Sequence, residues 1–349
     1  MRIFTFKGLF FTAVFMLLGC LSIQAADDDL ITKQITIKLD EAGTLPDRIA
    51  KSKIYKITNL KLVGEINGTD LRMIREMAGR DYSGYFTDGK LSVLDLSEAM
   101  IVEGGLLYYS DYSCYTTNNE IGKFAFKGCS GLTSLTLPTN IKWIGESAFS
   151  GCSGLTSLTL PDGVEKIGQS AFYHCSGLTS LTLPSSITTI SENAFEGCSG
   201  LTSLTLPDGV TEICASAFSG CSGLTSLTLP SNITEIGEWA FSDCSGLASI
   251  YVYAEKVPKI GEDVFKGCDA TKCILYVPKG TYDDYFISNF GYFENIEEFE
   301  VTGIGKPTTS TDAKELSRYS VNGQRLVGPT KGLNIVKYSD GSVKKVVVQ

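Results

Sequence analysis

Any chemistry in this 349-residue chain would have to come from eleven cysteines, one histidine and a recurring series of glutamates. Zinc sites combine closely spaced cysteines with one another or with histidine, and a nucleophilic cysteine or serine needs a neighbouring base. His174, the single histidine, directly precedes Cys175. The residues that precede the other repeated cysteines are Gly128, Gly151, Gly197, Gly220 and Asp243. This pattern predicts an exposed turn, so we expect no metal site, no cofactor and no catalytic residue.

The glutamates recur at spacings that are multiples of about one repeat, as Glu165, Glu212 and Glu235. Two carboxylates at a suitable separation could act as the acid and base of a glycoside hydrolase, provided that their surroundings differ. Nothing in the sequence gives these three different surroundings. A solvated acidic stripe is the favoured interpretation, and an extracellular hydrolase is the least favoured alternative function.

Most of the cysteines are periodic. Those that recur once in each repeat are Cys129, Cys152, Cys175, Cys198, Cys221 and Cys244. Stacked repeats would place them in one column with parallel Cβ vectors, a poor geometry for disulfides, so we expect buried free thiols that pack as small hydrophobic groups. Cys268 and Cys273 in CDATKC are the best candidates for a disulfide, while Cys114 stands alone in a loop.

The element that positions these side chains is a 23-residue repeat. The decapeptide CSGLTSLTLP occurs five times without change from Cys129 onward, and degraded copies follow it. Its L-x-x-L-x-L spacing and its period are typical of leucine-rich repeats. The I-G-x-x-A-F segment of each unit supplies the opposite wall of the core. The sequence therefore predicts a β-rich (α+β) solenoid with an N-terminal α/β cap and a small C-terminal β module.

Residues between the strand leucines should point outward and form a flat polar face. Its hydroxyl column, which ends in a tyrosine, is Thr136, Thr159, Thr182, Thr205, Thr228 and Tyr251. Such a regular face suits a repetitive ligand such as a polysaccharide or a fibrous protein, but duplication of the repeat alone would also produce it.

Aromatic residues gather at both ends of the array. An insertion before the first regular repeat carries Tyr108, Tyr109, Tyr112 and Tyr115. Exposed tyrosines supply amphipathic contact area, so this insertion is our preferred ligand-contact patch. The alternative is a capping loop that folds these tyrosines over the end coil. At the other end, the aromatic residues between Tyr251 and Phe293 are interpreted as a hydrophobic cap.

The chain divides into five expected regions. These are a signal peptide at 1–25, an N-terminal cap region at 27–90, the solenoid at 91–299, a linker at 300–315 and a C-terminal β module at 316–349. The regular repeats run over about 120–268, and a C-terminal cap covers 269–299. A short helix around Leu71, Ile74 and Met77 is expected in the N-terminal region. Asn322-Gly323 and Asp340-Gly341 predict hairpin turns in the module.

The segment 1–25 has the pattern of an export signal, with basic residues before an apolar run too short to span a membrane as a helix. Two processing sites are possible. Lipidation of Cys20 in Leu17-Leu18-Gly19-Cys20 is favoured, and cleavage after Ala25 is the alternative. A lipid on Cys20 would be the only membrane contact. The net charge of −9 argues against nucleic acid as a partner.

The unit C-x-x-L-x-x-L-x-L-P followed by I-x-x-x-A-F resembles that of the BspA-like (Bacteroides surface protein) leucine-rich-repeat family over residues 120–268. The resemblance implies an adhesive, non-catalytic cell-surface or outer-membrane protein that binds an extracellular protein or glycan. The C-terminal module resembles the sorting tails of exported Bacteroidetes proteins. A structural component of the outer envelope and a secreted effector remain alternative functions.

Overall fold

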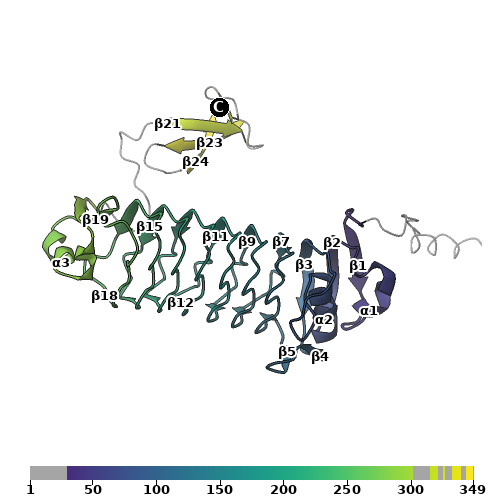
Figure 1. Cartoon of the computed structure of the whole chain (residues 1–349). Coiled ribbons are helices and arrows are strands. Elements are labelled where there is room, and N and C mark those ends of the chain that lie inside the picture. Colours follow the sequence, from purple (N-terminus) through teal and green to yellow (C-terminus); the bar gives the residue numbers. More distant parts are fainter. Residues whose placement is uncertain (1–29, 302–314, 321–324, 327–331, 339–342, 349) are drawn as a thin grey trace, which may run out of the picture.

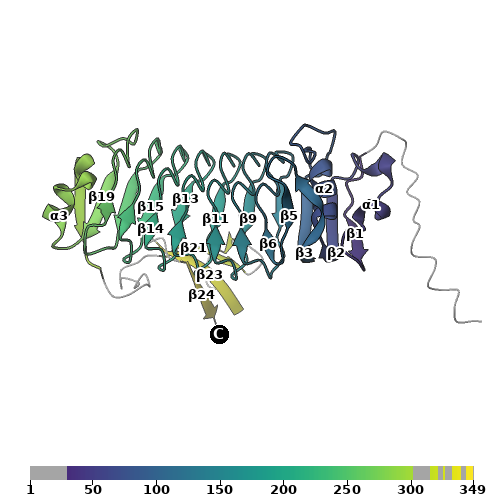
Figure 2. The same cartoon turned by 90° about the horizontal axis from the view of Figure 1, so that it is seen from below.

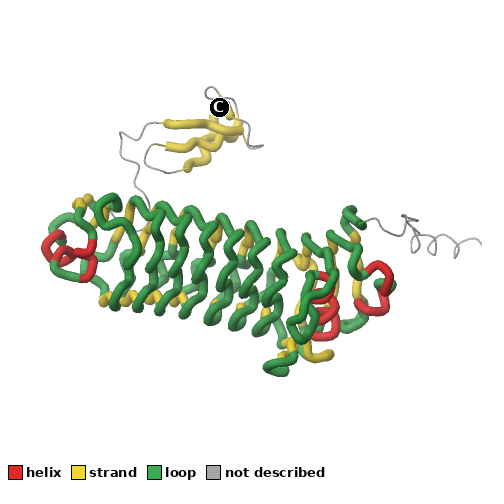
Figure 3. The backbone as a smooth tube through the Cα atoms, viewed as in Figure 1, coloured by secondary structure: helices red, strands yellow, loops and turns green. Residues whose placement is uncertain are grey.

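The structure is a computed structural model, and it describes residues 30–301 together with four strands of the C-terminal module (Figure 1). Cys20, Ala25 and the predicted signal peptide lie outside the described residues, as do most of the predicted linker and the two predicted hairpin turns of the module. Residues 30–301 form one elongated solenoid, and most of each coil is turn rather than strand (Figure 3). The predicted solenoid of 23-residue repeats is confirmed.

One long side of the solenoid, which we call the strand face, is built from parallel strands (Figure 2). The first sheet contains β1 (Ile35–Leu39), β2 (Asn59–Ile66), β3 (Val93–Ile101), β7 (Ser134–Thr136), β9 (Ser157–Thr159) and β11 (Ser180–Thr182). The second contains β13 (Ser203–Thr205), β15 (Ser226–Leu229), β17 (Ser249–Val252), β19 (Ile274–Pro278) and β20 (Asn295–Phe299). Because β1 and β2 pair in the same sheet as the repeats, coil stacking begins within the N-terminal region.

The register of the strand face follows the repeat without a shift from β9 to β11. Leu158 lies opposite Leu181, and the flanking serines and threonines lie opposite their own kind. Alternation along each strand buries the leucine and exposes its two neighbours. The repeated sequence therefore produces repeated columns on the surface.

A second side carries two-residue strands. They are β6 (Glu120–Ile121), β8 (Trp143–Ile144) and β10 (Lys166–Ile167) in one sheet, and β12 (Thr189–Ile190), β14 (Glu212–Ile213), β16 (Glu235–Ile236) and β18 (Lys259–Ile260) in another. Glycine follows the isoleucine in most coils, because a Cβ at Gly168 would lie 2.7 Å from the backbone nitrogen of Glu146. Ser191 replaces this glycine where the pairing between β10 and β12 is interrupted, and its hydroxyl donates to the carbonyl of Ile167 at 2.5 Å.

The third side is a continuous row of turns, which we call the turn row. Here alternate backbone N–H groups donate forward to the next coil, as from Phe149 to Ala171 and from Phe172 to Ala194, both at 2.8 Å. The short strands also make bonds in the opposite direction, as from Gly168 back to Ile144 at 2.8 Å. The hydrogen bonds of the turn row therefore also connect the two coils whose short strands, β10 and β12, are not paired.

Two stacked columns fill the core beside the turn row. The rings of Phe149, Phe172 and Phe195 lie nearly parallel, with centroids 5.2 Å apart. In the second column each buried cysteine from Cys152 onward donates its S–H to the phenylalanine carbonyl of the preceding coil, as from Cys175 to Phe149 at 3.1 Å. The prediction of a column of buried free thiols is confirmed.

The predicted Cys268–Cys273 disulfide is wrong. Both thiols are free and buried. Cys268 is a member of the thiol column and donates to the Phe241 carbonyl at 3.4 Å. Cys268 is therefore the last member of the thiol column and is not bonded to Cys273.

The N-terminal end is closed by α1 (Leu45–Arg48), the 3-10 turn η1 (Lys51–Lys53), α2 (Gly68–Met77) and a hairpin of β4 (Gly104–Tyr109) with β5 (Cys114–Thr116). The predicted apolar helix face is confirmed, since Leu71, Ile74 and Met77 on α2 are all buried. The fully buried carboxylate of Asp70 accepts bonds from the N–H groups of Gly43, Leu45 and Asn67. Asp70 thereby ties the start of α2 to the loop before α1.

Arg75 of α2 caps the first coil. It is completely buried, and its Nη1 donates to the carbonyls of Phe124 and Ala125 at 2.8 and 2.9 Å. In later coils the carbonyl equivalent to Ala125 accepts an N–H from the coil before it, as Ala148 does from Phe126. The first regular coil has no such predecessor, so a guanidinium supplies the missing donor.

The C-terminal end is closed by α3 (Tyr282–Phe286) and the 3-10 turn η2 (Asn289–Tyr292). Tyr285, Phe290 and Phe293 are buried, and the rings of Phe290 and Phe293 lie 5.6 and 5.0 Å from that of Phe265. These three residues form the predicted hydrophobic cap, whereas Tyr282, Phe286 and Tyr292, which the same prediction included, are exposed. In the module, β21 (Glu315–Ser320), β22 (Arg325–Leu326), β23 (Gly332–Tyr338) and β24 (Val343–Val348) form an antiparallel sheet in the order β22-β21-β23-β24.

Candidate functional site

The strand face presents a column of outward-pointing hydroxyl groups. Thr136, Thr159, Thr182 and Thr205 are exposed, and within residues 30–301 their hydroxyls make no hydrogen bond to the protein. By contrast, the threonines at the start of each strand use their hydroxyls internally, as Thr156 does by donating to the Thr133 carbonyl at 3.2 Å. The outward column is therefore free to bond to a ligand.

This column ends in aromatic side chains. Thr228 and Tyr251 are half-buried, and the Tyr251 ring stacks on that of Tyr276 at 4.4 Å with 9° between the planes. Phe299 packs edge-on against Tyr251 and Tyr253, at 6.2 and 5.1 Å. We call these four residues the aromatic end of the strand face: Tyr251, Tyr253, Tyr276 and Phe299.

The sequence assigned Tyr253 and Tyr276 to the hydrophobic cap, and this was wrong. Tyr276 lies on β19, directly opposite Tyr251 on β17, so both rings belong to the outward column. The spacing of Tyr251 and Tyr276 in the sequence, which is close to one coil, is the signal that could have identified the pair. Phe299 lies beyond the recognisable repeats and gave no comparable signal.

The insertion behaves only partly as predicted. Tyr108 and Tyr109 are buried, with 1% and 5% exposure, so their assignment as ligand contacts is wrong and the capping alternative holds for them. The Tyr108 hydroxyl donates to the Lys123 carbonyl at 3.0 Å and, like Arg75, caps the first turn. Burial raises the pKa of Tyr108 above the ordinary tyrosine value. Tyr112 and Tyr115 are exposed.

The short-strand side carries charged pairs between neighbouring coils. Glu165 pairs with Lys142 at 3.0 Å, and Glu235 pairs with Lys259 at 2.6 Å. These pairs are more than two-fifths exposed and contribute little to stability. In the part of the chain that the structure describes, no group of acidic, cysteine or histidine side chains could hold a metal ion. His174 is exposed with a φ of 53°, in agreement with the predicted turn.

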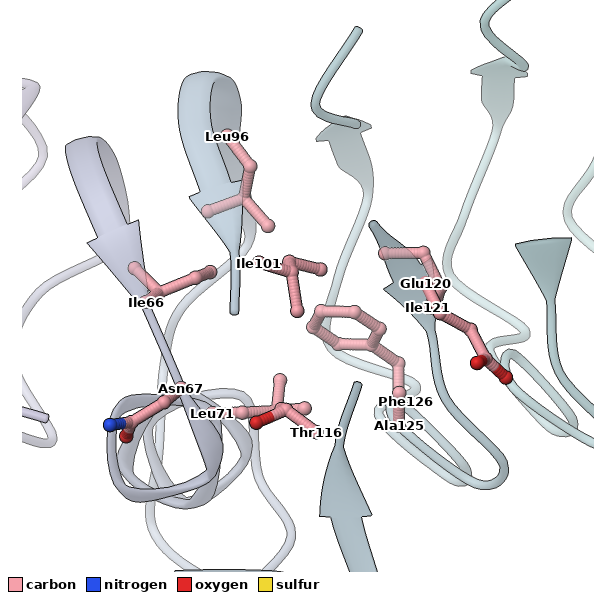
Figure 4. A pocket seen from close by; sticks show the side chains of 10 residues that line it. All are labelled: Ile66, Asn67, Leu71, Leu96, Ile101, Thr116, Glu120, Ile121, Ala125 and Phe126. Carbon is pink, nitrogen blue, oxygen red and sulfur yellow. The ribbon is translucent and has the colours of Figure 1, made fainter. Parts of the chain in front are cut away.

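The described solenoid contains two hollows of note. The first, at the junction of the N-terminal cap and the first coil, is lined mainly by apolar side chains that include Ile66, Ile101 and Phe126 (Figure 4). Its volume of about 10 Å³ is too small for a ligand. The second, of about 490 Å³, is an open depression beside η2, where the Lys266 and Asp263 side chains are already paired at 2.9 Å. Neither hollow gathers unpaired polar groups as binding pockets do.

The candidate membrane contacts are not tested by the geometry, because Cys20 lies outside the described residues. Among the residues that are described, no helix is long and apolar enough to cross a membrane.

Comparison with known proteins identifies the repeats. A family profile described as "BspA type Leucine rich repeat region" matches in six copies over residues 110–222 and 166–289, which together cover slightly more than half of the chain. No curated protein matches.

Similar solved structures include two described as leucine-rich-repeat proteins and one described as a vaccine antigen. TpLRR of T. pallidum is 35% identical, with a TM-score of 0.42 over 44% of this chain and 71% of that chain. A protein from Bacteroides ovatus is 25% identical, with a TM-score of 0.35 over 57% and 64%. The pneumococcal vaccine antigen PcpA is 20% identical, with a TM-score of 0.45 over 70% and 57%. The chain thus spans less than two thirds of the last two proteins.

Proposed function

The chain belongs to the BspA-type leucine-rich-repeat family, and from this premise we propose that it is an exported, non-catalytic protein that binds an extracellular protein or glycan through its strand face. Lipidation of Cys20 would hold it at the outer surface, and cleavage after Ala25 would release it from its signal peptide without a lipid. The support for export comes from the signal-like segment 1–25.

The observation that carries the proposal is the hydroxyl column that leads into the aromatic end. Four exposed threonine hydroxyls repeat coil by coil and have no partner within the described solenoid. No charged side chain interrupts the outward positions from β7 to β17. A long ligand with regularly spaced polar groups could therefore bond to several coils at once, which adds affinity through repetition.

Binding energy should concentrate at the aromatic end. Hydroxyl groups on a flat face form hydrogen bonds that contribute little net binding free energy, because water competes for them. Aromatic side chains provide most of the energetic anchors in binding surfaces. Tyr251 and Tyr276 combine a stacked apolar surface with hydroxyl groups, so we expect them to be the main anchors.

A binding comparison tests the assignment of the surface. Purified residues 26–349 are screened against extracellular-matrix proteins and immobilised glycans, and the best ligand is titrated against a Tyr251→Ser/Tyr276→Ser variant. We expect at least tenfold weaker binding. The matched control is Tyr282→Ser/Phe286→Ser, which alters an exposed stacked pair on α3 instead. Equal loss in both variants, or no loss in the first, would remove the strand face as the site.

Protease treatment of intact cells tests the location independently. We expect the solenoid to be digested while a periplasmic marker stays intact. Full protection would contradict the surface location and favour the alternative of an inward-facing structural component of the envelope. Recovery mainly from the medium would favour a secreted effector.

A further inference from the structure

A second exposed surface lies at the N-terminal end, where three cations lie against aromatic rings. Arg72 is 3.7 Å from the ring centroid of Tyr82, Arg80 is 3.5 Å from that of Phe86, and Lys127 is 4.9 Å from that of Phe124. Tyr112 also stacks on Phe124, with ring centroids 4.8 Å apart. We call the six outer residues the cation–aromatic patch: Arg72, Arg80, Tyr82, Phe86, Tyr112 and Lys127.

The patch combines exposed apolar area with charge. Phe86 is 80% exposed and Tyr112 is 68% exposed, and Tyr85 beside them is 74% exposed. Large aromatic side chains exposed together, with arginines among them, have the composition of the anchors found in protein–protein interfaces.

The three cations have no carboxylate partner within residues 30–301. Some other surface lysines of the solenoid are paired across coils, as Lys123 is with Glu146 at 2.9 Å. The acids near the patch are bonded elsewhere. Asp81 accepts from the N–H groups of Ser83 and Tyr85. The carboxylates of Asp111 and Glu76 accept from the hydroxyls of Ser110 and Tyr55. These three acids balance the three cations in charge, so the attraction for an acidic partner comes from the short-range pairs that Arg72, Arg80 and Lys127 can form, and not from a net positive field.

The surface is held in place by the cap beneath it. The Ser110 N–H at the hairpin tip donates to the Tyr82 carbonyl at 2.8 Å, and Arg80 Nε donates to the Gly128 carbonyl at 2.9 Å. These bonds join the loop after α2 to the hairpin and to the first turn. A partner would thus meet an ordered surface, which lowers the entropic cost of binding.

We propose that the cation–aromatic patch is a docking site for an acidic segment of another protein, one that carries aromatic or aliphatic side chains between its carboxylates. The carboxylates would pair with Arg72, Arg80 and Lys127, while the apolar side chains would cover Phe86 and Tyr112. A sulfated polysaccharide would satisfy the cations but leave these exposed rings uncovered, so the patch fits a polypeptide better. This site is separate from the strand face and does not depend on the function proposed for it.

Fluorescence anisotropy with a labelled peptide, Glu-Glu-Phe repeated four times, tests the proposal on residues 26–349. We expect saturable binding that weakens as salt is raised. The Arg72→Gln/Lys127→Gln variant should bind at least tenfold more weakly, and Phe86→Ser should also weaken binding. Arg80 is left unchanged because its bond to Gly128 is structural.

The matched control is Lys142→Gln/Lys259→Gln, which removes the same charge from the short-strand side and should bind as the parent does. Circular dichroism confirms that each variant is folded. The proposal is overturned if the acidic peptide does not bind, if a Gln-Gln-Phe peptide binds equally well, or if the control variant loses as much affinity. It is also overturned if a heparin fragment binds through Arg72 and Lys127 while the peptide does not.

Discussion

The thiol column links the stability of the solenoid to pH. Burial raises the pKa of Cys175, Cys221 and Cys268 to about 12, from an ordinary value of 9.0. A raised folded-state pKa means that the stabilising contribution is complete below the unfolded-state pKa and is lost as pH rises toward the folded-state pKa. The window in which these thiols change stability is therefore about pH 9 to 12.

Replacing one member of the column should make stability less sensitive to alkaline pH. In Cys175→Ser, the hydroxyl can still donate to the Phe149 carbonyl but does not titrate in this window. We expect the fall in the free energy of unfolding between pH 9.5 and 11 to become shallower by about 1.4 kcal/mol per pH unit. Urea unfolding at several pH values measures this slope. Thr182→Ser, which removes no titrating group, should keep the parent slope, and an unchanged slope in Cys175→Ser would contradict the argument.

Glycines determine how closely neighbouring coils approach. A Cβ added to Gly177 would lie 2.3 Å from the carbonyl oxygen of Ser153, whereas one added to Gly163 would lie 3.5 Å from its nearest neighbour, the Ile141 carbonyl oxygen. Neither glycine has a positive φ. Comparing the two positions therefore separates lack of space from backbone strain.

Gly177→Ala should lower the free energy of unfolding by about 2 kcal/mol, because the coils must move apart to admit the methyl group. Gly163→Ala should be neutral or stabilising by up to about 1 kcal/mol, because alanine restricts the unfolded chain. Urea unfolding of both variants measures the difference. Equal effects at the two positions would show that coil spacing is not limited by the glycine.

The repeated elements were predictable from the sequence, and the ends were predictable only in part. Leucine, phenylalanine and cysteine positions recur in every unit, so one interpretation of a coil applied to all of them. The prediction that Tyr108 is exposed failed because its burial depends on a hydrogen bond to a carbonyl of the first coil. The composition of the hairpin does not reveal this contact. The capping role of Arg75 was not identified from the sequence, because a charged residue on a helix is ordinarily expected at the surface. Tyr276 was missed because its coil is slightly longer than the regular repeat.

Along its length the solenoid is stabilised by contacts between neighbouring coils rather than by a single centre. Each interface in the regular array repeats the same phenylalanine stack, with centroids 5.2 to 5.5 Å apart. Removing one complete unit should therefore join two coils that already fit each other.

Deletion of residues 152–174, one whole unit, should give a folded protein that is shorter by about 5 Å. Its circular dichroism per residue should match that of the parent, and small-angle X-ray scattering should record the shorter rod. Deletion of residues 152–163 is the control, because half a unit places turn against strand and should prevent cooperative folding. A misfolded product from the whole-unit deletion would contradict the equivalence of the interfaces.

The opposed hydrogen-bond directions of the turn row and the short strands have an electrostatic consequence. In an α-helix every peptide dipole points the same way, and the sum places partial charges at the two ends. Here the forward bonds from Phe149 to Ala171 and the backward bonds from Gly168 to Ile144 oppose each other along the axis. Bonds that oppose each other in this way reduce the axial dipole that each coil adds below that of an α-helical turn, so the ends of a lengthening array polarise less than those of a helix.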